Sequence, residues 1–239
     1  PMEDSIHPAD NSPAILFIRN ISTSKTYYIS FDHPDSHISF DINYFIENVL
    51  KKSNKIKWVL DKKTFEQYIK LSNVYDANLC GFLKDNEIER IDTFETVAHS
   101  LIRRQSNGIP KFAKMVPLMK HKEMFDDLAD VIIKMIRKFV IDESFLSINN
   151  IVLPTLGKIE SNGIYVNTDL YLKYFLNKPN KNGYVFSEYN VYTSTGRPSN
   201  RYNSVNYAAL NHSDGSRRSF ISRYNNDGRM DVIDYTAFH

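Results

Sequence analysis

A polar segment near the carboxyl end of the chain groups residue types that suit nucleic-acid binding. A glycine there lets the backbone turn tightly and approach another surface, and Pro198 fixes the direction of exit. Short hydroxyl and amide side chains beside a guanidinium can grip a sugar-phosphate backbone or reach base edges in the minor groove. The residues that offer these groups are Thr195, Gly196, Arg197, Ser199 and Asn200. A hairpin turn beside a helix explains the same spacing without any ligand.

A second candidate group is the carboxylate of Asp234, 38 positions after Gly196. It stands near the end of an expected strand, Met230–Tyr235. Phosphoryl transfer by two magnesium ions needs carboxylates that bridge both ions. One aspartate alone binds Mg²⁺ weakly, and a strand-end carboxylate is usually only solvated, so this residue needs a partner acid to do chemistry.

Together these segments resemble the start of the palm domain in family A (bacterial polymerase I-like) DNA polymerases, and small phage polymerases look closest. Thr193–Asn200 matches the T-x-T-G-R-x-S-S block, with Pro198 and Asn200 as departures. Asn206–Leu210 stands for the family's N-L-x-N stretch, and Arg217–Phe220 stands for its R-x-x-F stretch. In the family these arginines and asparagines touch primer and template near the growing end.

The resemblance implies roles for individual residues. Arg197, Asn206 and either Arg217 or Arg218 are expected to bind primer-template DNA. The family's first metal motif reads D-Y-S-Q-x-E, so Asp234 and the backbone carbonyl of Tyr235 are expected to bind Mg²⁺ for nucleotidyl transfer from deoxynucleotides. Ala237 and His239 depart from the Q and E of that motif, so its nucleotide-binding and sugar-selection roles are not carried over.

The family places its second metal-binding Asp, its triphosphate-binding Lys and its fingers helix well after this motif. We therefore expect the N-terminal part of a DNA polymerase for DNA replication, either a fragment or a subunit completed by a second polypeptide. The isolated chain is expected to be inactive in polymerisation. The alternatives are a non-catalytic DNA-binding or scaffold module derived from a polymerase, or a 3'-5' exonuclease.

Two earlier regions extend the resemblance. Leu156–Asn167 is similar to the segment that opens the family's thumb, but only 31 residues separate Gly163 from Thr195, which predicts a much reduced thumb. Further upstream, Asp61 and Asp76 resemble acids of the RNase H-like 3'-5' exonuclease domain. Leu128 replaces a catalytic Asp of the third exonuclease motif, and the first motif, D-x-E, is missing. We expect a vestigial domain without nuclease activity.

Hydrophobic periodicity predicts an α/β layer that becomes α+β over the whole chain. The sequence predicts a flexible arm (1–13). The polymerase resemblance implies a degenerate RNase H-like exonuclease-type domain (14–145), a reduced helical thumb or connector (146–182) and the first strands of a palm (183–239). Expected strands cover 14–18, 26–31, 56–60 and 184–195, and expected helices cover 40–52, 124–139, 154–162 and 167–175. Asp61 is expected to cap a helix, and Gly163 to end one in a left-handed conformation.

Composition is that of a folded chain. Hydrophobic residues make up 42% of 239 residues, and the formal net charge is only +2, so the arrangement of cations matters more than their total. From Tyr192 onward every cationic side chain other than histidine is an arginine. The single cysteine, Cys80, excludes an internal disulfide and favours a reducing, cytoplasmic setting. The resemblance to phage polymerases implies that the cell is bacterial or phage-infected. No apolar run approaches the roughly 20 residues that span a bilayer, so no membrane partner is expected.

Overall fold

The chain divides into two compact units, each with its own core, in a computed structural model. The first unit comprises Pro1–Lys158 and Tyr192–Gly196, and the second comprises Ile159–Val191 and Arg197–His239. The residues described are 13, 15–30, 33, 35, 41–85, 117–137, 139–193, 195–200, 206, 210–211, 213–224 and 227–231. Their elements are mixed α and β, as expected, and the described strands form four two-stranded sheets.

The first unit begins with a β-hairpin at the expected place. β1 (Ile15–Arg19) pairs antiparallel with β2 (Thr26–Ser30). The turn between them is closed by Asn20, whose Oδ1 accepts hydrogen bonds from the backbone N–H groups of Ser22 and Thr23 at 3.0 and 3.1 Å. Asparagine favours such turns because its short side chain replaces a backbone acceptor.

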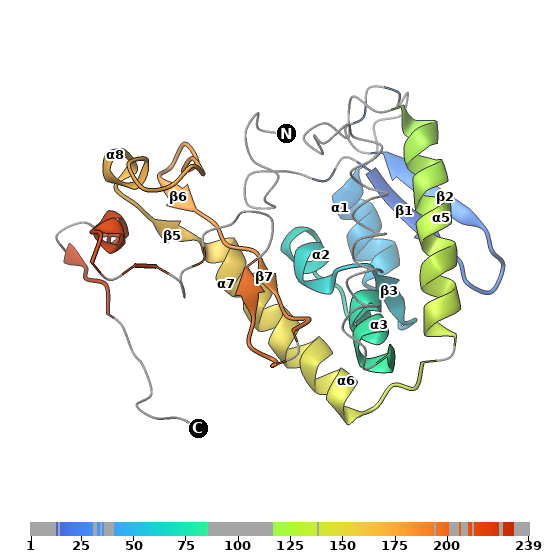
Figure 1. The fold of residues 1–239 in the computed structure, drawn as a ribbon. Coiled ribbons are helices and arrows are strands. Elements are labelled where there is room, and N and C mark those ends of the chain that lie inside the picture. Colours follow the sequence, from blue (N-terminus) through green and yellow to red (C-terminus); the bar gives the residue numbers. More distant parts are fainter. Residues whose placement is uncertain are drawn as a thin grey trace. The chain divides into compact units, whose positions relative to one another are not determined.

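A long helix, α5 (Leu118–Ile136), packs along β1 (Figure 1). Phe17 of the hairpin stacks on Phe125 of the helix with ring centroids 5.1 Å apart. The helix was expected over 124–139; it begins six residues earlier and ends three residues earlier. Among the helices that the structure describes, none has the length and apolar character needed to cross a membrane.

A strand–helix–strand unit follows the hairpin. After α1 (Ile42–Phe45) and the π-helical turn η2 (Ile46–Leu50), strand β3 (Lys57–Val59) lies parallel to β4 (Val74–Asp76). Helix α2 (Lys62–Tyr68) connects them, and α3 (Ala77–Asp85) follows directly on β4. Parallel pairing brings the carboxyl ends of both strands, and the amino ends of both helices, to the same edge.

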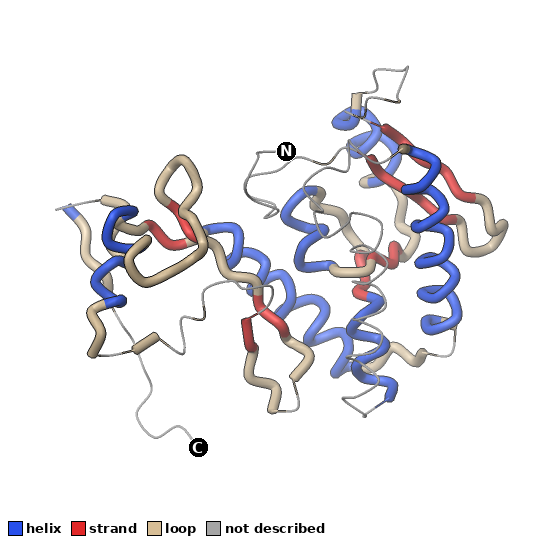
Figure 2. The backbone as a smooth tube through the Cα atoms, turned by 45° about the horizontal axis from the view of Figure 1, so that its top comes forward, coloured by secondary structure: helices blue, strands red, loops and turns tan. Residues whose placement is uncertain are grey.

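Three contiguous segments form one unbroken helical rod: α6 (Glu143–Ser147), the π-helical turn η4 (Ile148–Val152) and α7 (Leu153–Asn162), traced in Figure 2. The expected helix over 154–162 is confirmed as α7, but the preceding ten residues were not predicted as helical. In the first unit Phe145 of this rod is fully buried and packs against the rings of Trp58, Tyr75 and Phe139.

The second unit has a small core. β5 (Ile164–Tyr165) pairs with β6 (Tyr184–Val185), α8 (Thr168–Tyr171) follows β5, and β7 (Tyr189–Asn190) pairs with β8 (Ser199–Asn200). The expected strand over 184–195 is thus two short strands, and the expected helix over 167–175 ends at Tyr171. The buried core residues are Val166, Tyr171 and Val185, with Ile164, Phe175, Leu210 and Phe220 packed around them.

The left-handed end of α7 is confirmed, since Gly163 has φ +59°. A Cβ on this residue would lie 2.6 Å from a ring carbon of Phe186. We therefore expect Gly163→Ala to lower the free energy of unfolding by about 2–3 kcal/mol, from backbone strain plus the clash. Gly215→Ala is the matched control, because Gly215 also has positive φ but its added Cβ would meet only the far end of the Tyr174 side chain, with the hydroxyl oxygen at 3.1 Å. Urea unfolding followed by circular dichroism compares the two, and equal losses would contradict the expected clash.

Candidate functional site

The structure brings together the two acids that the sequence singled out in the first unit. Asp61 follows β3 and Asp76 ends β4, so both stand at the shared carboxyl edge of the two parallel strands. Their charges interact, and this repulsion is one of the causes that raise the pKa of Asp76. In open α/β folds this edge is where ligands commonly bind.

Both acids cap helices, because their side-chain oxygens accept backbone N–H groups at the amino ends of α2 and α3. Asp76 Oδ2 accepts from the backbone N–H of Lys62 at 2.7 Å, and Oδ1 accepts from the backbone N–H of Leu79 at 2.8 Å. The hydroxyl of Tyr192 also donates to Oδ1, at 3.1 Å. Asp61 Oδ1 accepts from Thr64 N at 3.0 Å, which confirms the expected cap of α2. The carboxylate of Asp76 therefore accepts one backbone N–H from the first turn of α2 and one from the first turn of α3.

This arrangement does not suit a metal ion. The side chain of Asp76 has no exposed surface, and both of its oxygens already accept hydrogen bonds. Burial, with repulsion from Asp61 second, raises the pKa of Asp76 to about 7, so the group is partly protonated near neutral pH. Within the described ranges, no group of three or more His, Cys, Asp or Glu side chains could hold a metal ion.

A neighbouring amide completes the cluster, and sequence reasoning missed it. Asn149, fully buried in η4, donates from Nδ2 to the carbonyl of Val74 at 3.0 Å and accepts at Oδ1 from the N–H of Asp76 at 2.9 Å. These two backbone groups lie on the side of β4 away from β3, since alternate residues of a strand face opposite neighbours. The amide therefore pairs with β4 as another strand would, and protects its edge.

The amino end of α2 also buries a cation. Lys62 is 4% exposed, and burial lowers the pKa of its ammonium group. Its Nζ lies 3.5 Å from Glu66 Oε1 and 3.4 Å from Asn150 Oδ1. Glu66 and Asp76 both raise the pKa of Lys62 by their charge, against the effect of burial. The positive charge of Lys62 therefore partly compensates the negative charges of Glu66 and Asp76 inside the first unit.

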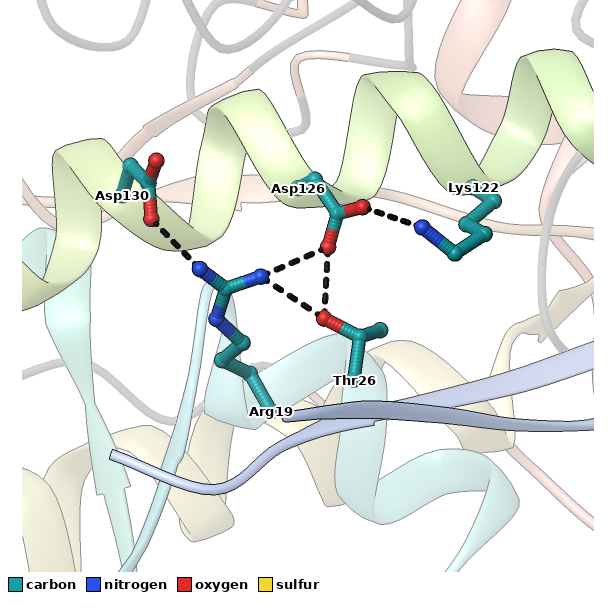
Figure 3. A network of polar contacts seen from close by, with 5 residues as sticks. All are labelled: Arg19, Thr26, Lys122, Asp126 and Asp130. Carbon is teal, nitrogen blue, oxygen red and sulfur yellow. Dashed lines mark hydrogen bonds and ion pairs between the residues drawn. The ribbon is translucent and has the colours of Figure 1, made fainter. Parts of the chain in front are cut away.

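The segment that was predicted to correspond to the third exonuclease motif lies on α5 and faces the β1–β2 hairpin (Figure 3). Arg19 Nη1 lies 2.9 Å from Asp126 Oδ1, and Arg19 Nη2 lies 3.1 Å from Asp130 Oδ1. Asp126 also accepts hydrogen bonds from Lys122 and Thr26, which hold the pKa of its carboxyl below the usual range. Leu128, which the resemblance places at the position of a catalytic acid, is half-buried. These contacts fasten α5 to the hairpin.

The predicted DNA-binding turn is formed and open. Gly196 has φ +70°, its N–H donates to the carbonyl of Thr193 at 3.1 Å, and a Cβ built on it would meet no atom within 4 Å. Residues 195–199 are all exposed. Asn200 is partly buried in β8, where its Nδ2 donates to Ser187 Oγ at 2.8 Å. Its amide therefore supports the β7–β8 hairpin.

The other predicted DNA contacts lie later in the second unit. Arg217 and Arg218 are exposed on the short 3₁₀ helix η6 (Ser216–Ser219), and Arg217 Nη2 donates to the carbonyl of Leu210 at 3.0 Å. Asn206 is exposed. Asp234 and Tyr235 lie outside the described residues, so the predicted Mg²⁺ site stays a prediction.

No protein-family model, curated protein or solved structure matches this chain. The resemblance to family A DNA polymerases therefore stays an expectation from the sequence motifs.

Proposed function

We propose that this chain is the N-terminal part of a template-directed DNA polymerase and that it binds primer-template DNA. The observation that carries the proposal is the exposed turn at Gly196, which is followed by the exposed Arg197 and where a Cβ built on the glycine would meet no atom within 4 Å. Such a turn lets a phosphate or a groove edge come close to the backbone while the guanidinium makes a bidentate contact. Arg217 and Arg218 add exposed positive charge in the same unit as Arg197.

The first unit is proposed to be a degenerate RNase H-like domain that no longer cleaves DNA. Support comes from Asp61 and Asp76, whose oxygens accept hydrogen bonds from the first turns of α2 and α3. A two-metal nuclease needs carboxylates with free coordination sites. The rival reading as a non-catalytic DNA-binding module shares this feature, and it predicts the same DNA contacts. The two readings differ only in whether Asp234 takes part in Mg²⁺-dependent nucleotide addition.

The test of the DNA interface is Arg197→Ala. We expect the dissociation constant for a fluorescein-labelled primer-template duplex to rise about 5–10-fold, because a phosphate or base-edge contact worth about 1–1.4 kcal/mol is lost. The slope of log K against log salt should fall by about one if the contact is to a phosphate. Fluorescence anisotropy at several salt concentrations measures both quantities.

Arg229→Ala is the matched control. Arg229 lies in the same unit as Arg197, and its replacement by alanine changes the net charge by the same amount. Its guanidinium pairs with Asp231 at 3.0 Å. We expect less than a twofold effect there. Equal weakening by both variants would show that only net charge matters, and no weakening by Arg197→Ala would refute the proposed interface.

A further inference from the structure

Tyr192 stands at the start of the proposed DNA-binding segment but points into the first unit. It is 7% exposed, while residues 195–199 are exposed. Its ring packs against Phe82 of α3 with centroids 5.6 Å apart. Its hydroxyl donates to Asp76 Oδ1 at 3.1 Å. A polar residue beside an exposed turn is thus held by both an apolar and a polar contact.

The carboxylate that accepts from Tyr192 is itself hydrogen-bonded to several elements. Asp76 ends β4 and accepts backbone hydrogen bonds from the first turns of both α2 and α3. Asn149 fixes the backbone N–H of Asp76 from the other side. A hydroxyl bonded to this carboxylate is therefore held to a point that three secondary-structure elements define.

Arg197 follows the anchored Tyr192 closely in the sequence. Tyr192–Gly196 belongs to the first unit, and Arg197 begins the next stretch of the second. Four residues separate the anchored Tyr192 from Arg197, and within them Gly196 N donates back to the carbonyl of Thr193. Fixing one end of so short a turn limits the positions that the guanidinium can reach.

We infer that Tyr192 is a positioning residue, which holds the Gly196 turn through Asp76 so that Arg197 is preorganised for the DNA backbone. This inference rests on the proposed function. Its physical basis is entropic, because a turn ordered before binding loses less conformational freedom when DNA binds.

The strength of the anchor should depend on pH. The acceptor is surrounded by Asp61, whose charge repels it, by the buried ammonium of Lys62, by the thiol of Cys80 and by the phenol of Tyr192 itself. Burial raises the pKa of Asp76, so its carboxylate gains a proton as the pH falls below about 7. A charged acceptor makes the stronger hydrogen bond. The contribution of Tyr192 to DNA binding is thus expected to be largest near pH 8 and smaller near pH 6.

The test is a double-mutant cycle between Tyr192→Phe and Arg197→Ala, with anisotropy of the labelled primer-template as the measurement. Tyr192→Phe keeps the ring against Phe82 and removes only the hydroxyl. At pH 8 we expect it to weaken binding about three- to fivefold in the native background and less than 1.5-fold in the Arg197→Ala background. At pH 6 the effect in the native background should fall below twofold. The fluorescence of Trp58 establishes that each variant is folded at the temperature used.

The outcomes separate the two proposals. If Arg197→Ala weakens binding and Tyr192→Phe does not, or if the two effects simply add, Tyr192 does not act through Arg197 and the inference is overturned while the interface stands. If Arg197→Ala has no effect, the proposed interface itself fails. A Tyr192→Phe effect that is the same at pH 6 and pH 8 would also contradict the anchor through Asp76.

Discussion

Replacing Asp76 with alanine is expected to lower the free energy of unfolding of the first unit by about 3–5 kcal/mol. The change leaves two buried backbone N–H groups, those of Lys62 and Leu79, and the hydroxyl of Tyr192 without their acceptor. Each buried donor left unpaired costs about 1–3 kcal/mol. Relief of the repulsion with Asp61 offsets part of this loss. Urea unfolding followed by the fluorescence of Trp58, the single tryptophan, reports on this unit.

The matched control is Asp61→Ala. Asp61 caps α2 by accepting a hydrogen bond from the backbone N–H of Thr64 and is partly exposed, so we expect a loss of about 1 kcal/mol. Similar losses for the two variants would show that Asp76 is not the common cap of both helices.

The pH dependence of the free energy of unfolding tests the burial of Asp76 independently of the alanine substitution. Because burial raises the folded-state pKa of Asp76 above its unfolded value, the folded protein binds more protons between about pH 4 and 7. By linkage, its contribution favours the folded state more as the pH falls through this window. Asp76→Asn cannot titrate, so the slope of unfolding free energy against pH should become less negative in this variant.

The elements of the first unit were largely predictable because their signals are local. A short apolar run marked β1, the turn after it marked the returning strand β2, a second short apolar segment marked β3, and the capping aspartate marked the start of α2. The helix over 143–152 was missed because Pro154 was taken as part of the first turn of a helix that begins there. Proline lacks the N–H that would bond the carbonyl four residues earlier. The π-helical turn η4 ends at Val152, two residues before this proline, and the helix continues directly into α7 from Leu153.

The candidate site was only partly predictable because its key contacts join distant parts of the chain. Asp61 and Asp76 could be paired from their resemblance to family acids and from their places after strands. Tyr192 and Asn149 lie 116 and 73 positions from Asp76, and no local pattern fixes such contacts. The available signal for Asn149 was a pair of asparagines, Asn149 and Asn150, between the apolar residues Ile148 and Ile151.

Phe145→Ala is expected to lower the free energy of unfolding of the first unit by about 3–5 kcal/mol. The side chain is fully buried, with ring centroids 5.1 Å from Phe139, 5.5 Å from Tyr75 and 6.1 Å from Trp58. Truncation removes these contacts and leaves a cavity. Because Trp58 is one of the partners, its emission should also shift toward that of a more exposed indole in the folded variant.

Phe145→Leu is the control for volume, and a loss of about 1–2 kcal/mol is expected because most of the cavity stays filled.

Phe145 and Asn149 are four positions apart and both face β4, one through Tyr75 and the other through Val74 and Asp76. If the aromatic contact holds the helix close enough for the amide to reach the strand, Phe145→Ala and Asn149→Ala should cost less together than their separate losses add up to. Strict additivity would mean that the amide keeps its place without the ring, and that the polar cluster around Asp76 is independent of the aromatic core beneath it.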